Sequence, residues 1–175
     1  MRYLIVGANN SGKSEHAEML LIKSGQSLGY FATLPPKDEH RTRILRHEER
    51  RDSRWVVHQA NYELSADISS LNMLLEVGAV LFDGLSIYLR ETILMQPDSA
   101  SVINALNAFC TSFTQVLSRA LSSWIVVDVA WEYLTGLDPY ELVDWTRYLQ
   151  SKLVTECGAV RIYTSFDKMA DTTRA

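Results

Sequence analysis

The chain has 175 residues, of which 47% are hydrophobic and 22% charged, and its net charge is -4. This composition is typical of one globular domain and excludes a disordered chain. The acidic balance excludes the overall basic field that attracts nucleic acid or anionic membranes, and no run reaches the roughly 20 apolar residues of a membrane span. We expect a single cytoplasmic domain over residues 1–175 without nucleic-acid or membrane partners, in which any anion binding is local.

Strand and helix patterns alternate along the chain. Apolar runs rich in β-branched residues predict strands at 3–6, 29–33, 79–83, 124–129 and 159–164, with 55–57 as a shorter sixth candidate. Helical spacing predicts helices at about 13–24, 38–51, 63–77, 85–95, 100–121 and 139–156. This order predicts an α/β fold with a mostly parallel sheet and helices on both faces. Ligands of such folds bind at the carboxyl ends of the strands.

The motif GANNSGKS occupies residues 7–14, directly after the first predicted strand. It fits G-x-x-x-x-G-K-[ST], the phosphate-binding loop, and it stands between a strand and a helix, as that loop does in known proteins. We therefore predict a P-loop NTPase-like domain that uses GTP or ATP as a substrate. The alternative is a glycine-rich turn with an exposed lysine.

Each residue type in this loop has a chemical reason. Gly7 and Gly12 permit the turn and the close approach of main chain to phosphate. The following helix directs its positive end at the same phosphates. Lys13 would reach the β- and γ-phosphates, and the Ser14 hydroxyl would hold Mg²⁺. The predicted nucleotide-binding residues of the loop are Gly7, Ala8, Asn9, Asn10, Ser11, Gly12, Lys13 and Ser14.

A second informative stretch is the arginine-rich segment 38–55. At about 100° per residue, one helix face within a sector of about 60° carries Arg43, His47, Arg50 and Arg54. The guanidinium groups disfavour an imidazolium, so His47 should stay neutral near pH 7 and keep a free lone pair. Such an imidazole suits attack on phosphorus while Arg43 and Arg50 bind the phosphate oxygens. The alternative is a solvated surface helix with weak ion pairs.

Asp83 ends a predicted strand and precedes a glycine. A carboxylate at this place is typical of a magnesium ligand that works with the phosphate-binding loop, directly or through water. The alternative is an N-cap for the following helix, which aspartate also serves well. Asp128, in the next buried strand, is a rival for the metal role.

Three stretches together resemble one family, the bifunctional cobinamide kinase and cobinamide-phosphate guanylyltransferase of cobalamin biosynthesis. The first is GANNSGKS, and the second is YFATLPPKDEHRTRILRHEERRDSRW, with its R-I-x-x-H helix and terminal Trp. The third is VLFDGLSIYL, which is similar to the family's V-L-V-D-C-L-T-x-W-L. Together they cover roughly the first half of the chain.

The resemblance implies two reactions on one domain. A nucleoside triphosphate bound at residues 7–14 phosphorylates the aminopropanol hydroxyl of (adenosyl)cobinamide. His47, which matches the family's guanylylated histidine, then takes GMP from GTP and passes it to cobinamide phosphate. The resemblance makes Lys13 and His47 the expected catalytic residues, supports Mg²⁺ ligation by Ser14 and Asp83, and implies a homo-oligomer.

The second half departs from the family's pattern. Residues 128–132 read DVAWE where the family has S-N-E-V-G, and Gln150 stands in place of Asn in a G-R-x-N-Q motif. Residues 161–167 replace the usual V-x-G-x-P tail, and Arg51 stands where proline is usual. Two alternatives therefore stay open: a P-loop kinase for another small molecule, and a nucleotide-sensing protein without catalysis. No Asn-Lys-x-Asp-like guanine motif is present, so the base preference also stays open.

Overall fold

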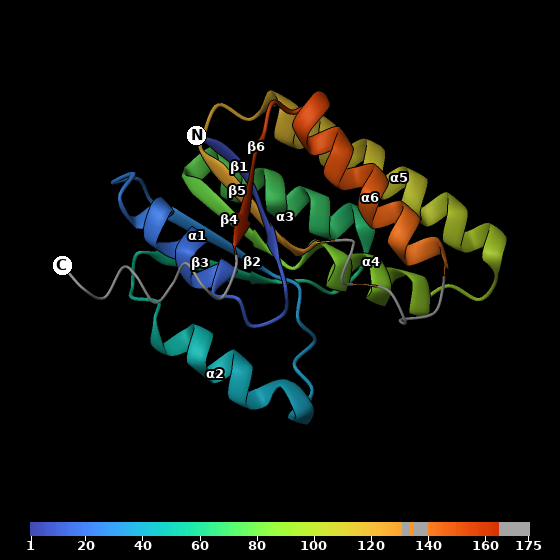
Figure 1. Cartoon of the computed structure of the whole chain (residues 1–175), viewed down its shortest axis with the longest axis horizontal. Helices are drawn as coiled ribbons and strands as arrows, with labels where there is room; N and C mark the ends of the chain where they lie inside the picture. Colours follow the sequence, from blue (N-terminus) through green and yellow to red (C-terminus); the bar gives the residue numbers. More distant parts are fainter. Residues whose placement is uncertain (131–133, 135–139, 165–175) are drawn as a thin grey trace.

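The computed structural model describes residues 1–130, 134 and 140–164 (Figure 1). A parallel six-stranded sheet has the order β3-β2-β4-β5-β1-β6. The strands are β1 (Arg2–Gly7), β2 (Leu28–Ala32), β3 (Trp55–Gln59), β4 (Ala79–Asp83), β5 (Trp124–Val129) and β6 (Val160–Thr164). The helices are α1 (Lys13–Ile22), the 3-10 helix η1 (Asp38–His40), α2 (Arg41–Glu49), α3 (Leu64–Val77), α4 (Leu85–Leu94), α5 (Ser99–Arg119) and α6 (Tyr140–Thr155). No helix in the described ranges is long and apolar enough to cross a membrane.

The sheet is buried on both faces because its strands are near-continuous apolar runs whose side chains alternate across the pleat. Leu4 and Val6 pack into a large cluster with α3, α4, α5 and α6, whereas Ile5 packs with Ala17 and Leu21 of α1. Figure 1 shows α5 and α6 together, well separated from α1. The predicted α/β architecture, a parallel sheet with helices on both faces, is confirmed.

Helix α2, like the short η1 before it, has no buried residue, whereas α1, α3, α4 and α5 each bury several. In Figure 1 it forms a separate rod beyond α1, β2 and β3. Its sequence explains this position, because only Ile44 and Leu45 are aliphatic and Leu45 is 46% exposed. A helix with so little apolar surface gains little from close packing on the sheet, so space remains beneath it.

The predicted helix at 38–51 is divided and ends earlier than expected, at Glu49. The prediction that Arg54 shares one helix face with the other basic residues is therefore wrong. Arg54 lies in the turn before β3, where its backbone N–H and its guanidinium donate to the Asp52 carboxylate. This local turn competes with continuation of the helix and leads the chain into β3.

The carboxyl-terminal ends of the parallel strands β1, β4 and β5 lie at the same end of the sheet, as the predicted order of elements requires. β5 separates β1 from β4, and the strand pairing sets Val6 opposite Asp128 and Val127 opposite Asp83. Gly7, at the end of β1, lies at the same edge. The structure thus gathers the phosphate-binding loop and both candidate aspartates. The short candidate strand at 55–57 is confirmed as β3, at the edge beside β2.

Candidate active site

The phosphate-binding loop links β1 to α1. Gly12, at φ 75°, is the N-cap of α1, and Asn10 has φ 58°. Both are left-handed conformations, which glycine adopts freely and asparagine tolerates better than most residues. Because α1 begins at Lys13, the free N–H groups of its first turn lie beside the loop. This is the arrangement that binds phosphate in other proteins.

Gly7 is required by close packing. A Cβ at this position would lie 2.5 Å from both the carbonyl oxygen and Oγ1 of Thr164 in β6. The Thr164 hydroxyl also shares a hydrogen bond of 2.9 Å with Ser11 Oγ. Thr164 therefore fixes the loop against β6, a role that nothing in the sequence indicated.

Lys13 lies back across the loop. Its Nζ donates to the carbonyl oxygens of Gly7, at 3.2 Å, and Ala8, and to Ser11 Oγ at 3.4 Å. Burial lowers the pKa of the Lys13 ammonium, while the carboxylates of Asp128 and Asp83 oppose that shift. The loop therefore carries a cation that is largely shielded from solvent.

Ser14 and Asp83 meet although they lie far apart in the sequence. Ser14 Oγ donates to Asp83 Oδ1 across 2.8 Å, and Asp83 is buried at the end of β4. The capping alternative for Asp83 is not supported, because the N-cap of α4 is Gly84 and no side chain of the cap makes a hydrogen bond there. The predicted metal ligands are thus adjacent, and hydroxyl and carboxylate oxygens are ligands that Mg²⁺ accepts.

Nδ1 of His47 faces several oxygen atoms. It lies 3.3 Å from Tyr30 Oη, 3.5 Å from Asp83 Oδ2 and 3.8 Å from Glu18 Oε1. Tyr30 donates its own hydroxyl proton to Asp83, so its oxygen can accept one from His47. Arg50 Nη2 is also 3.3 Å from Nδ1, but it donates to Glu18 as well. The oxygen neighbours favour a proton on Nδ1, which leaves the lone pair on Nε2.

Burial lowers the pKa of His47 to about 4. Its side chain is only 12% exposed. The guanidinium groups of Arg50, Arg43 and Arg51 lower this pKa further, whereas the Asp83 carboxylate raises it. The expected neutral imidazole therefore agrees with its surroundings, but burial contributes more than the arginines on which the expectation was based.

Polar contacts attach the C-terminal end of α2 to the rest of the protein. Arg50 forms a two-pronged ion pair with Glu18 of α1, at 2.8 and 3.2 Å. The Arg51 guanidinium lies 3.7 Å from the centre of the Tyr30 ring, and its Nε donates to the carbonyl oxygen of His47. These contacts hold His47 over the end of the sheet, where apolar packing of α2 is absent.

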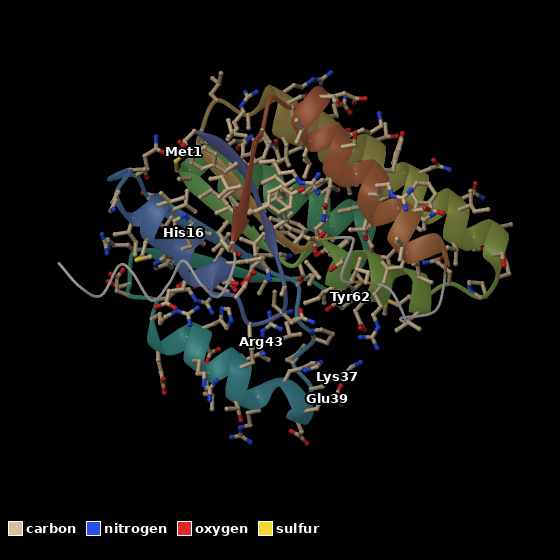
Figure 2. All side chains as sticks on the ribbon, in the orientation of Figure 1. Met1, His16, Lys37, Glu39, Arg43 and Tyr62 are labelled. Atoms are coloured by element: carbon tan, nitrogen blue, oxygen red, sulfur yellow. The ribbon has the colours of Figure 1, made fainter. Side chains whose placement is uncertain are left out.

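Two cavities meet at His47. One of about 310 Å³ lies over the phosphate-binding loop, and one of about 260 Å³ lies between α2 and the strands β2 and β3. Arg43, His47 and Asp83 line both, and Figure 2 shows Arg43 between α2 and the rest of the protein. The predicted site residues that line the larger cavity are Asn9, Asn10, Ser11, Gly12, Lys13, Ser14, Arg43, His47, Arg50 and Asp83. Arg46, which was not predicted, lines it too, whereas Gly7 and Ala8, whose carbonyl oxygens accept from Lys13, do not.

Comparison with known proteins agrees with this arrangement. The family described as cobinamide kinase / cobinamide phosphate guanyltransferase has a model that matches residues 3–157. The chain belongs to this family. A curated relative, the bifunctional adenosylcobalamin biosynthesis protein CobP of Pseudomonas aeruginosa, is 36% identical over 96 residues. That alignment covers 54% of each protein, so it spans about half the length of the relative.

Two solved structures are similar to this chain at low sequence identity. The RadB recombinase is 16% identical with a TM-score of 0.49, over 82% of this chain and 70% of its own. The flagellar accessory protein FlaH of Methanocaldococcus jannaschii is 15% identical with a TM-score of 0.48, over 84% and 66%.

In this member of the cobinamide kinase / guanyltransferase family, Asp128 contacts backbone and amide donors. Its Oδ1 accepts from the backbone N–H groups of Ser86 and Val129, and its Oδ2 accepts from Gln150 Nε2, each across 2.8 Å. Ser86 lies in the first turn of α4, so Asp128 caps that helix. Burial raises the pKa of Asp128. Asp83, and not Asp128, contacts the Ser14 hydroxyl of the phosphate-binding loop, which makes Asp83 the better candidate for the metal.

Three residues from the stretches that depart from the family's pattern, Asp128, Gln150 and Arg161, belong to one network. Gln150 donates to Asp128, and its Oε1 accepts a hydrogen bond of 2.6 Å from Arg161 in β6. Hydrogen bonds therefore link these residues to one another beside the site. The departures at 131–132 and 165–167 lie outside the described residues.

Proposed function

We propose that the chain carries out both reactions named by its family. It phosphorylates the aminopropanol hydroxyl of (adenosyl)cobinamide with a nucleoside triphosphate, and it transfers GMP from GTP to cobinamide phosphate through His47. The observation that carries this proposal is the place of His47, on the wall shared by both cavities with Nδ1 turned to Asp83. A merely solvated surface helix would expose this imidazole, but its side chain is 12% exposed.

In the phosphorylation step the triphosphate lies over the loop. The N–H groups of the first turn of α1 and the Lys13 ammonium balance its charge, and Arg43 and Arg46 add to the positive field of the same cavity. The acceptor hydroxyl attacks the γ-phosphorus and loses its proton. The bond from that phosphorus to the bridging oxygen breaks, and the nucleoside diphosphate leaves.

In the transfer step Nε2 of His47 attacks the α-phosphorus of GTP, and pyrophosphate leaves as the bond to the bridging oxygen breaks. Nδ1 keeps its proton, so the guanylylated ring is a cation. The carboxylates of Asp83 and Glu18, 3.5 and 3.8 Å from Nδ1, stabilise that cation. An oxygen of cobinamide phosphate then attacks the same phosphorus, the P–N bond breaks, and neutral His47 is restored.

We further propose that Ser14 and Asp83 hold Mg²⁺. Their oxygens are of the type that Mg²⁺ prefers, and they are 2.8 Å apart. A bound Mg²⁺ would neutralise part of the phosphate charge in both reactions. Phosphate oxygens and water would supply the other ligands, as is usual for this ion.

The test is incubation of the purified protein with [α-³²P]GTP and Mg²⁺, followed by denaturing electrophoresis. We expect label on the parent chain and none on a His47→Ala variant, which should still phosphorylate cobinamide. A His40→Ala variant is the matched control, because His40 lies in η1 outside both cavities. Absence of label where GTP is shown to bind would contradict the transfer step, and phosphate transfer without label would support a kinase alone.

The homo-oligomer is likewise a proposal, and it rests on likeness to the family. Size-exclusion chromatography with light scattering measures the mass in solution directly. A mass of about 20 kDa, the mass of one chain, at working concentration would contradict it.

A further inference from the structure

A buried carboxylate outside the proposed active site organises the loop between β3 and α3. Asp67, in the first turn of α3, is 1% exposed and has no part in the reactions described so far. Its Oδ1 lies 3.0 Å from Nε2 of His58 in β3 and accepts the backbone N–H of Asn61, while its Oδ2 accepts the hydroxyl proton of Tyr88 in α4. Such donors satisfy the carboxylate and make its burial tolerable. Asp67 therefore ties the loop to both β3 and α4.

The same loop holds Tyr62 in a conformation that its residue type disfavours. Tyr62, labelled in Figure 2, has a φ of 64°, in the left-handed region. A bulky aromatic residue is an outlier there. The loop is fixed on both sides of it, because the N–H of Asn61 donates to Asp67 and the Asn61 side chain accepts from the N–H of Glu63. Backbone strain of this kind persists only where the surroundings over-determine it, and such residues cluster at functional sites.

The Tyr62 side chain contacts the chain just beyond β2. Its hydroxyl donates to the backbone carbonyl of Thr33 across 2.8 Å, and its ring centre lies 5.7 Å from that of Tyr88. Burial raises the pKa of this hydroxyl, and the carboxylates of Glu91 and Asp67 raise it further. The phenol therefore keeps its proton near neutral pH and remains a donor to Thr33.

Thr33 extends this contact to Asp83. Thr33 is fully buried, and its Oγ1 lies 2.6 Å from the backbone carbonyl oxygen of Asp83 and 2.8 Å from that of Gly84. The hydroxyl has one proton to donate, and these two oxygens share it. The backbone at the end of β4 is therefore held against the chain just beyond β2, and Tyr62 holds that chain in turn.

We propose that Tyr62 is a positioning residue for the guanylyl transfer. It acts through Thr33 on the backbone of Asp83 and so fixes the direction of the Asp83 carboxylate. That carboxylate lies 2.8 Å from Ser14 Oγ and 3.5 Å from His47 Nδ1, so a shift of the strand end would lengthen these contacts. The inference rests on the proposed function, in which this carboxylate stabilises guanylylated His47. Tyr62 lines neither cavity, so it acts through other residues and not on the nucleotide itself.

The first test is Tyr62→Phe, which keeps the ring and removes the hydroxyl. In single-turnover labelling with [α-³²P]GTP and Mg²⁺, the rate at saturating GTP should fall about fivefold to tenfold. The GTP concentration that gives half of the maximal rate should change less than about twofold. A role in stability alone would change neither value in the folded protein. Tyr148→Phe in α6 is the matched control, because Tyr148 lines neither cavity, and it should leave both values unchanged.

A second variant tests the path through Thr33. Thr33→Val keeps the shape of the side chain but removes its hydroxyl, so the link to Asp83 is already broken in that background. Tyr62→Phe should then slow labelling by less than about twofold. Amide exchange measured by NMR tests the same link without any chemistry. The N–H of Gly84, which donates to Val127 across 2.9 Å, should exchange about tenfold faster in Tyr62→Phe than in the parent.

The inference is overturned by an unchanged labelling rate in Tyr62→Phe, by equal slowing in the parent and Thr33→Val backgrounds, or by unchanged exchange at Gly84. These results are separate from failure of the proposed function. No label on the parent, with faster exchange at Gly84 in Tyr62→Phe, overturns the transfer step and leaves the link from Tyr62 to Asp83 supported. Label on the parent with an unchanged rate in Tyr62→Phe overturns the positioning role alone.

Discussion

Oδ2 of Asp83 lies 3.5 Å from Nδ1 of His47, while Oδ1 of the same carboxylate accepts a hydrogen bond from Ser14 in the phosphate-binding loop. The Asp83 side chain therefore contacts both Ser14, the other proposed magnesium ligand, and His47, the proposed nucleophile. No residue of α2 is buried, so this contact and the Glu18–Arg50 ion pair fix the place of His47 more than apolar packing does. The two proposed reactions thus share one carboxylate.

Asp83→Asn tests this sharing. The variant keeps the shape of the side chain but removes the charge that stabilises a guanylylated His47 cation. Loss of one preorganised electrostatic partner typically slows a reaction by about 100-fold or more, and we expect that reduction in the initial rate of [α-³²P]GTP labelling. Asp144→Asn is the control, because Asp144 is an exposed carboxylate paired with Arg147 and lines neither cavity. Equal labelling rates for Asp83→Asn and the parent would show that the carboxylate has no part in the transfer.

The low pKa of His47 predicts an unusual pH dependence. Attack on phosphorus requires the neutral ring, so the labelling rate falls as the pH drops through the pKa of His47, which is about 4. At pH 5.5 a histidine with the ordinary pKa of about 6.5 would be only about 9% neutral, whereas His47 should be about 97% neutral. Single-turnover labelling rates should therefore differ little between about pH 5.5 and pH 7.5. A tenfold decrease over that interval would mean that His47 titrates as an exposed histidine.

The sequence predicts most of the fold because its strongest signals are local. Apolar runs mark every strand of the sheet, and GANNSGKS between a strand and a helix identifies the loop. The order of elements then places Asp83 and Asp128 at the correct edge. Their separate roles depend on partners far along the chain, Ser14 for one and Gln150 for the other, and neither pairing is visible in a local pattern.

The contacts around His47 were missed for the same reason. Glu18 looks like an ordinary helix residue, although it falls beside Ala17 and three residues before Leu21, on the face of α1 that packs on the sheet. A glutamate on a buried helix face requires a polar or charged partner, so the place of Glu18 in the sequence could have predicted such a partner. Tyr30 gives a weaker signal, since aromatic residues are common in buried strands. Arg54 was misplaced because a regular helix was extended past the turn at Asp52.

Glu18→Gln tests whether the ion pair with Arg50 anchors α2. Glu18 is buried and hydrogen-bonded to a guanidinium, so its neutralisation should lower the free energy of unfolding by about 1–3 kcal/mol in urea titrations. Because α2 has no buried residues, its amide protons should also exchange faster with solvent. Glu15→Gln in the same helix is the control, since Glu15 is exposed. Unchanged exchange in α2 would show that other contacts hold the helix.

Gly7→Ala tests the packing of the phosphate-binding loop against β6. The added Cβ would lie 2.5 Å from the carbonyl oxygen of Thr164, so the two strands must separate or the loop must shift. Overpacking of this kind costs about 1–3 kcal/mol, and we expect a loss near the upper end because one of the colliding atoms belongs to the backbone. The variant should also bind inorganic tripolyphosphate more weakly than the parent, since the Ser11–Thr164 hydrogen bond positions the loop.

Gly25→Ala is the matched control for this variant, because Gly25 has φ 68° and a Cβ there would meet nothing within 4 Å. It isolates the cost of a left-handed alanine, about 1 kcal/mol, and should leave tripolyphosphate binding unchanged. Urea titrations and calorimetry on both variants compare collision with β6 at position 7 with backbone strain at position 25. If Gly7→Ala loses no more stability than Gly25→Ala and binds tripolyphosphate normally, the contact with Thr164 does not position the loop.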